Sequence, residues 1–282
     1  MQPLDNYDHV EILSVENEAV PVYRIVPPKL TQEELDVLDR YKKIVTQKEL
    51  DNARKEPEVS LRWELMRDFL MKKLPETPSK EFLVRKIAGM SFGYDELSLF
   101  VDDDNLEEIM VNGVNTPVYV FHRRYGMCKT NLTFGSPDAI RKIIFNICFV
   151  NKRDSNLPIL DIAALDGSRI NITADPLPSK GSTITIRKQR RKTFTVIELI
   201  KSRTVSVDLA AFLWLAVEGL KLTPANMIIA GSIGSGKTTT LNSICIFIPP
   251  NERIVTIEDT LEVNLDNIEN KVQLEANQNY DM

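Results

Sequence analysis

Residues 231–238 read Gly-Ser-Ile-Gly-Ser-Gly-Lys-Thr, a complete G-x-x-x-x-G-K-[ST] phosphate-binding loop. The apolar run at residues 227–230 leads into the loop and predicts a buried strand. The spacing of apolar residues over 237–247 predicts a helix, which the prolines at 249 and 250 end. Strand, glycine loop and helix in this order are the context in which the motif binds phosphate. The stretch therefore predicts a nucleotide-binding α/β domain, against the alternative of an ordinary glycine-rich turn.

The residue types in this loop suit a nucleotide. Glycines let backbone N–H groups turn inward around a phosphate, and the N-terminus of the following helix adds unpaired donors and a favourable dipole. Lys237 supplies a positive charge for the outer phosphates, and Thr238 can place its hydroxyl on Mg²⁺. The residues that we expect to bind ATP here are Gly231, Ser232, Ile233, Gly234, Ser235, Gly236, Lys237, Thr238 and Thr239.

An acidic segment follows the loop. Residues 253–257 form a buried-strand pattern that ends on an acidic pair. Carboxylates at the end of a strand beside a phosphate loop lie where Mg²⁺ and the attacking water are held in P-loop enzymes. The pattern fits a Walker B strand, and the alternative is a strand end with solvated carboxylates. The residues expected in catalysis are Lys237, Glu258, Asp259 and Glu262, and those expected at Mg²⁺ are Thr238 and Glu258.

Bulk composition excludes several classes of protein. The 282 residues are 43% apolar and 27% charged, which is ordinary for a globular chain with a sizeable core. The net charge of −5 argues against a surface devoted to nucleic acid. Three scattered cysteines and two histidines support neither a disulfide framework nor a zinc site. No signal peptide or membrane-spanning stretch is visible, so we expect a cytoplasmic protein.

Residues 1–78 predict a helical N-terminal extension. Thr31 and Glu34 form a capping box, after which a helical stripe of apolar residues runs to about Leu50. Residues 51–60 are charged and contain proline, which indicates a loop, and residues 61–70 predict a second amphipathic helix. The alternative is a solvated arm that docks on the next domain.

Residues 79–190 predict an α+β domain, in which Asp166 and Gly167 mark a hairpin turn. The expected elements are a helix over 82–87, strands over 108–111 and 118–122, a helix over 136–150, the hairpin strands 159–165 and 168–173, and a strand over 183–187. A basic run at 187–192 leads into a linker over 191–205.

Residues 206–282 predict the P-loop domain, which opens with a helix that ends at Gly219. The residues after Thr238 are too few to complete such a domain, whose sheet of five or more strands needs roughly a hundred further residues. We therefore expect the chain to be a fragment of a longer protein.

These motifs resemble those of the secretion-traffic ATPases, which power type II secretion, type IV pili and archaella. The first match is Ile-Glu-Asp-Thr-x-Glu at 257–262, which follows a GSGKTTTLN loop. Further matches lie upstream, at residues 107–113, 117–126, 165–169 and 183–188. The sequences of these motifs are most similar to those of the archaeal branch, and the resemblance covers most of residues 81–275.

The resemblance implies an incomplete RecA-like P-loop core behind a PAS-like α+β domain, assembled as a hexameric ring. It implies that the acidic segment is the family's "Asp box", and that Walker B and the His box would come further along. It also implies that arginines of the preceding domain contact the triphosphate, with Arg187 best placed. The implied residues are Arg169, Arg187, Arg190 and Arg191. The partner would be a membrane platform protein at the inner face of the cell membrane, with no nucleic acid.

Two other functions stay open at this point. One is a RecA-like nucleic-acid motor, which the basic run at 187–192 favours and the negative net charge disfavours. The other is a non-catalytic subunit that only docks through its upstream domains. For the leading interpretation we predict that this chain binds ATP weakly and hydrolyses it poorly, because hydrolysis depends on the Walker B segment more than binding does.

Overall fold

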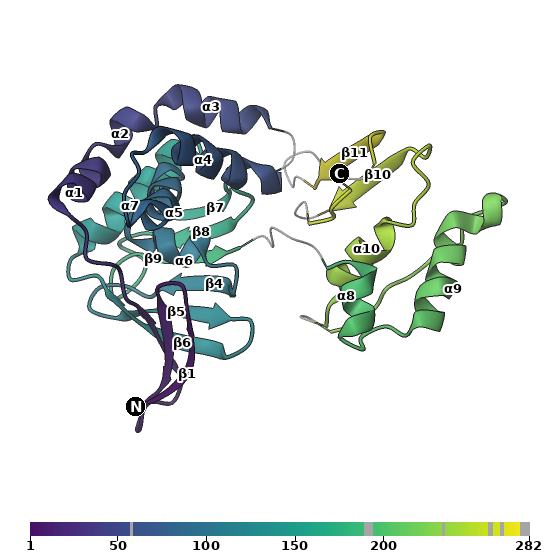
Figure 1. The fold of residues 1–282 in the computed structure, drawn as a ribbon, viewed down its shortest axis with the longest axis horizontal. Coiled ribbons are helices and arrows are strands. Elements are labelled where there is room, and N and C mark those ends of the chain that lie inside the picture. The colour runs from purple at the N-terminus through teal and green to yellow at the C-terminus, as the bar shows by residue number, and fades with distance from the viewer. Residues whose placement is uncertain (57–58, 189–193, 233–234, 259–261, 266–267, 277–282) are drawn as a thin grey trace. The chain divides into compact units, whose positions relative to one another are not determined.

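The computed structural model describes residues 1–56, 59–188, 194–232, 235–258, 262–265 and 268–276. The chain divides into two compact units, Met1–Arg191 and Lys192–Met282, each of which contains helices and strands (Figure 1). The predicted mixture of α and β structure is therefore confirmed. Among the described residues, no helix combines the length and the apolar character needed to cross a bilayer.

The first unit is built on a large sheet, whose described strands have the order β1-β2-β3-β6-β5-β4-β9-β8-β7. Neighbouring strands are antiparallel except for β3 and β6, which are parallel. The strands are β1 (Gln2–Tyr7), β2 (Val10–Ser14), β3 (Val22–Ile25), β4 (Leu106–Val111), β5 (Pro117–His122), β6 (Gly126–Thr133), β7 (Ile159–Ala163), β8 (Arg169–Thr173) and β9 (Thr183–Arg187).

Alternation of side chains decides which face of this sheet enters the core. In β8, Ile170 and Ile172 are fully buried, whereas Arg169 and Asn171 between them are exposed. The predicted hairpin between β7 and β8 is confirmed. Gly167 takes a positive φ of 84° in its turn, a conformation that glycine adopts at little cost.

Helices of the first unit pack on the same core. Trp63 of α4 stacks on Phe92 with ring centroids 4.9 Å apart, and α7 contributes Ile140, Ile143 and Ile147. The helix predicted over 136–150 is confirmed as α7, in which Ser136 is the N-cap and a proline occupies the first turn. The helices are α1 (Gln32–Asp39), α2 (Tyr41–Ile44), α3 (Gln47–Lys55), α4 (Val59–Lys73), α5 (Lys80–Ser91), the 3-10 turn η1 (Asp95–Leu97), α6 (Ser98–Asp102) and α7 (Pro137–Val150).

The prediction of a helical extension over residues 1–78 was wrong for residues 2–25 only. From Thr31 on it is confirmed, because the capping box with Glu34 starts α1 and a further helix, α4, forms over Val59–Lys73. The chain begins with the three strands β1 to β3, and β3 joins the main sheet by pairing with β6. The predicted helix to Leu50 is also divided, because a second capping box at Thr46 and Glu49 starts a new helix, α3. Helices α3 and α4 extend into the loop predicted at 51–60. Short strands with mixed exposure carry little periodicity, which explains why β1 was missed.

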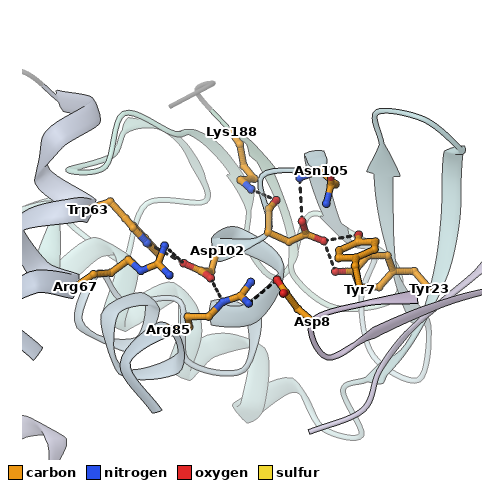
Figure 2. A network of polar contacts seen from close by, with 10 residues as sticks. Tyr7, Asp8, Tyr23, Trp63, Arg67, Arg85, Asp102, Asn105 and Lys188 are labelled. Carbon is orange, nitrogen blue, oxygen red and sulfur yellow. Dashed lines mark hydrogen bonds and ion pairs between the residues drawn. The ribbon is translucent and has the colours of Figure 1, made fainter. Parts of the chain in front are cut away.

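A buried carboxylate pair ties the first strands to the body of this unit (Figure 2). The hydroxyls of Tyr7 and Tyr23 donate to Oδ2 of Asp103, at 2.7 and 2.6 Å. The neighbouring Asp102 accepts from the indole of Trp63 at 2.9 Å and from Arg85, which also bonds Asp8. Burial, followed by the Asp103 charge, raises the pKa of both tyrosines, so they remain donors.

The second unit contains fewer elements. They are α8 (Val196–Lys201), α9 (Val207–Glu218), the 3-10 turn η2 (Gly219–Lys221), α10 (Lys237–Cys245), β10 (Ile254–Glu258) and β11 (Lys271–Glu275). Strands β10 and β11 are parallel. Thr195 and Glu198 form a capping box on α8. The predicted helix end is confirmed, because Gly219 ends α9 with a φ of 69°.

The buried strand predicted at 227–230 is absent from the described part of this unit. Residues 227–230 have no regular structure, and Ile228 is 95% exposed. A strand exists through hydrogen bonds to a neighbour, and the described ladder here pairs only β10 with β11. β10 forms as predicted, but it is not buried, because Val255 and Ile257 are exposed.

Candidate nucleotide-binding site

The phosphate loop turns into α10 at Gly236. This residue has a φ of 87°, and a Cβ placed on it would meet no atom within 4 Å. The restriction to glycine is therefore conformational rather than steric. Helix α10 begins directly afterwards at Lys237, and the N–H groups of its first turn have no acceptor within the helix. These amides and the helix dipole create a place for an anion.

Lys237 lies across the loop. Its ammonium group donates to the carbonyl of Gly231 at 3.0 Å and to that of Ser232 at 2.7 Å. The side chain therefore folds back over the residues that begin the motif, instead of extending into solvent. A phosphate bound at this loop would compete with the two carbonyls for the ammonium group.

The other predicted loop residues are placed as follows. Gly231, Ser232 and Ser235 are exposed, and Thr238 and Thr239 are half-buried in the first turn of α10. Ile233 and Gly234 lie outside the described residues. The described part of the loop is therefore open to solvent, as a ligand would require.

The acidic segment begins at the carboxyl end of β10. Oε2 of Glu258 accepts hydrogen bonds from the N–H groups of Glu262 at 2.7 Å and Val263 at 2.8 Å. Oε1 of Glu258 is buried and has no hydrogen-bond partner among the described residues. Glu262 is exposed, whereas Asp259 lies outside the described residues. One oxygen of Glu258 thus holds the backbone of residues 262 and 263, and the other is unpaired within the described part of the chain.

Asn242 of α10 is a site residue that sequence reasoning missed. Its Nδ2 donates to the carbonyl of Glu262 at 3.0 Å, and its Oδ1 accepts from the N–H of Asn264 at 2.8 Å. The acidic segment is thereby fastened to the phosphate-loop helix. Asparagine is a poor helix former, so its presence in the middle of a predicted helix was the available signal.

Two side chains of β11 hold the same segment from another direction. Gln273 donates to the carbonyl of Val263, and Lys271 donates to that of Leu265, both at 2.9 Å.

Burial, followed by the Glu258 charge, raises the pKa of the Cys245 thiol at the end of α10. This thiol is therefore protonated near neutral pH and is a poor nucleophile.

The residues present fit ATP and Mg²⁺. The start of α10 and Lys237 suit the phosphates, while the Thr238 hydroxyl and the unpartnered oxygen of Glu258 are hard oxygen ligands of the kind that Mg²⁺ prefers. In the described ranges there is no group of three or more acidic, histidine or cysteine side chains that would hold a metal by itself. Magnesium usually binds through one or two protein oxygens together with substrate phosphates, so two protein ligands are enough for a Mg²⁺ site of this kind.

The predicted arginines lie in the first unit. Arg169 of β8 and Arg187 of β9 are register partners in the ladder, and both are exposed. Arg190 and Arg191 lie outside the described residues. Of the basic run, Lys188 is only 8% exposed and donates to the backbone carbonyl of Asp103. This burial removes one cation from the surface that a nucleic-acid motor would need.

Comparisons with known proteins agree with the motifs. Residues 152–282 match the family model described as type II/IV secretion system protein. An uncharacterized protein of Methanocaldococcus jannaschii is 48% identical over 171 residues, which are 60% of this chain and 24% of that protein. The type IV secretion system protein VirB11 of Bartonella henselae is 30% identical over 60% of this chain and 56% of its own. The type IV secretion system protein PtlH of Bordetella pertussis is 34% identical over 42% of this chain and 40% of its own length.

Over residues 152–282 the chain is therefore similar to the type II/IV secretion ATPases, as the resemblance indicated. It spans 24% and 29% of the length of two relatives from Methanocaldococcus jannaschii. Among solved structures, the VirB11 ATPase from the Brucella suis type IV secretion system, in complex with sulphate, is 22% identical with a TM-score of 0.36. That likeness covers 68% of this chain and 63% of the VirB11 chain.

Proposed function

We propose that this chain is the nucleotide-binding part of a motor ATPase that serves a type II/IV secretion, pilus or archaellum machine. The observation that carries the proposal is the Lys237 ammonium folded over the loop that opens α10, in a chain similar to the secretion ATPases. ATP is the substrate, and its hydrolysis would drive fibre assembly or protein export.

Each site residue has a role in this proposal. Lys237 and the first amides of α10 bind the phosphates, and Thr238 with Oε1 of Glu258 would hold Mg²⁺. The metal neutralises phosphate charge when it is bound. Glu262 orders the water around it, and its exposed carboxylate is free to do so within the described part of the chain.

The first unit supplies further positive charge and a docking body. Arg169 and Arg187 would contact the triphosphate, and the unit would act as the PAS-like domain in front of a RecA-like core. The motor would work as a hexameric ring on a membrane platform protein, on the cytoplasmic side. The relatives named as type IV secretion system proteins support this assignment.

Binding of a fluorescent ATP analogue, titrated with Mg²⁺ and with EDTA, tests the proposal. We expect binding that the metal strengthens and that Lys237→Ala abolishes. Equal binding by this variant would show that the loop is not the site. Hydrolysis by this chain is expected to be poor, and turnover equal to that of a longer relative would contradict that expectation.

A further inference from the structure

We propose that Asn242 is a positioning residue, which holds the backbone of Glu262 in place so that its carboxylate serves the metal shell of a bound nucleotide. The inference rests on the proposed function and extends it to Asn242, which ends the GSGKTTTLN stretch and to which the resemblance gave no role. In this proposal the side-chain carboxamide of Asn242 connects the phosphate-loop helix to the acidic segment.

The position of Asn242 on α10 is the first argument. It follows Thr238 by four residues, so the two side chains lie on the same face of the helix, with a rise of about 6 Å between them. The hydroxyl expected at Mg²⁺ and the carboxamide that binds the acidic segment therefore point to the same side. Asn242 brings the segment to the face of the helix that carries the metal-binding hydroxyl.

The contacts of Glu262 are the second argument. Its carbonyl accepts from Nδ2 of Asn242 at 3.0 Å, and its N–H donates to Oε2 of Glu258 at 2.7 Å. The peptide groups on both sides of its Cα are thus held by side chains from two different elements, α10 and β10. A Cα fixed in this way limits where the carboxylate can reach, although the carboxylate itself is exposed.

Other hydrogen bonds hold the acidic segment without Asn242, so the role of Asn242 in positioning Glu262 can be tested apart from attachment of the segment. Gln273 and Lys271 of β11 bond the carbonyls of Val263 and Leu265 independently of α10. Loss of the Asn242 carboxamide should therefore move Glu262 without detaching the segment. Displacement of an outer-shell partner typically lowers metal affinity by about 10- to 100-fold, whereas contacts between the loop and the phosphates do not depend on it.

The test compares Asn242→Leu with Gln273→Leu, a matched loss of one carboxamide on the same segment. The affinity for the fluorescent ATP analogue is measured for each variant with Mg²⁺ and with EDTA. We expect Asn242→Leu to keep its affinity in EDTA within about twofold and to lose about tenfold or more of the strengthening by Mg²⁺. Gln273→Leu should keep most of that strengthening.

The outcomes are distinguishable. If wild type binds no nucleotide, or if Lys237→Ala binds equally, the proposed function fails and the inference falls with it. If wild type binds and Asn242→Leu responds to Mg²⁺ as Gln273→Leu does, the inference alone is overturned. Equal loss of affinity in Mg²⁺ and in EDTA would also overturn it, because the residue would then support the loop itself.

A measurement on the wild-type chain needs no folded variant. The N–H of Val263 donates a hydrogen bond to Glu258, and the N–H of Asn264 donates one to Asn242. Hydrogen exchange at these two amides should slow more with nucleotide and Mg²⁺ than with nucleotide and EDTA. Equal protection in the two conditions would overturn the inference.

Discussion

Arg169 of β8 stands directly opposite Arg187 of β9 in an antiparallel ladder, and Glu108 of β4 stands opposite Arg187 on its other side. Like charges in facing positions destabilise a sheet, and an opposite charge on the next strand offsets part of that cost. The sheet thus concentrates positive charge at one point, which suits recognition of an anion more than it suits stability.

Replacement of either arginine should show this difference. Arg169→Gln removes the repulsion and leaves Arg187 opposite Glu108, so the free energy of unfolding should stay unchanged or rise by up to about 0.5 kcal/mol. Arg187→Gln also removes the attraction to Glu108, so its free energy of unfolding should stay close to that of wild type. The affinity for Mg·ATP should fall, because the proposed function gives each arginine a contact with the triphosphate. Urea unfolding and analogue titration measure the two effects. A loss of stability above about 1 kcal/mol would assign the pair a structural role instead.

Gly236→Ala should weaken both folding and nucleotide binding. An alanine at a φ of 87° carries a strain of roughly 1–2 kcal/mol, which the loop would relieve by leaving its phosphate-binding conformation. Gly126→Ala is the matched control, because Gly126 has a φ of 70° and equally open surroundings in the first unit. It should lower stability similarly and leave ATP binding intact. Equal ATP affinity in both variants would contradict the role of Gly236.

Acid should destabilise the first unit through His122, which is 3% exposed. Its Nδ1 accepts from the N–H groups of Arg124 and Tyr125, and burial lowers its pKa in spite of nearby carboxylates. The charges that act on it are Asp103 and Asp5, which raise the pKa, and Arg124 and Arg123, which lower it. Since the folded pKa lies below the unfolded value of 6.5, the unfolded chain binds more protons, and stability falls as pH drops below 6.5.

The variant His122→Gln tests this assignment. It should flatten the dependence of unfolding free energy on pH between about 7 and 5, which urea unfolding at several pH values measures. The same slope in wild type and in His122→Gln would exclude His122 as the cause.

Local signals in the sequence predicted the elements around the site well. The helix after the loop, the strand before Glu258 and the glycine end of α9 formed where capping residues and apolar spacing placed them. The hairpin at Gly167 could be predicted because its turn needs a residue with positive φ, and the pair Asp166 and Gly167 supplies one. Such features depend on neighbours in the sequence.

Features that depend on distant partners were missed. Residues 227–230 are apolar enough for a strand, but a strand needs a neighbour, and no described strand pairs with them. β3 was missed for the converse reason, since its partner β6 is about a hundred residues away. The role of Asn242 depends on a segment twenty residues downstream, so only the structure reveals the contact.

Mg²⁺-dependent binding of a fluorescent ATP analogue, with Lys237→Ala measured beside wild type, tests the central claim most directly. The structure places the Lys237 ammonium over the loop, so we predict that wild type binds, that Mg²⁺ strengthens binding, and that the variant loses it. Absence of binding in a folded wild-type chain, or equal binding by the variant, would contradict a nucleotide site at this loop.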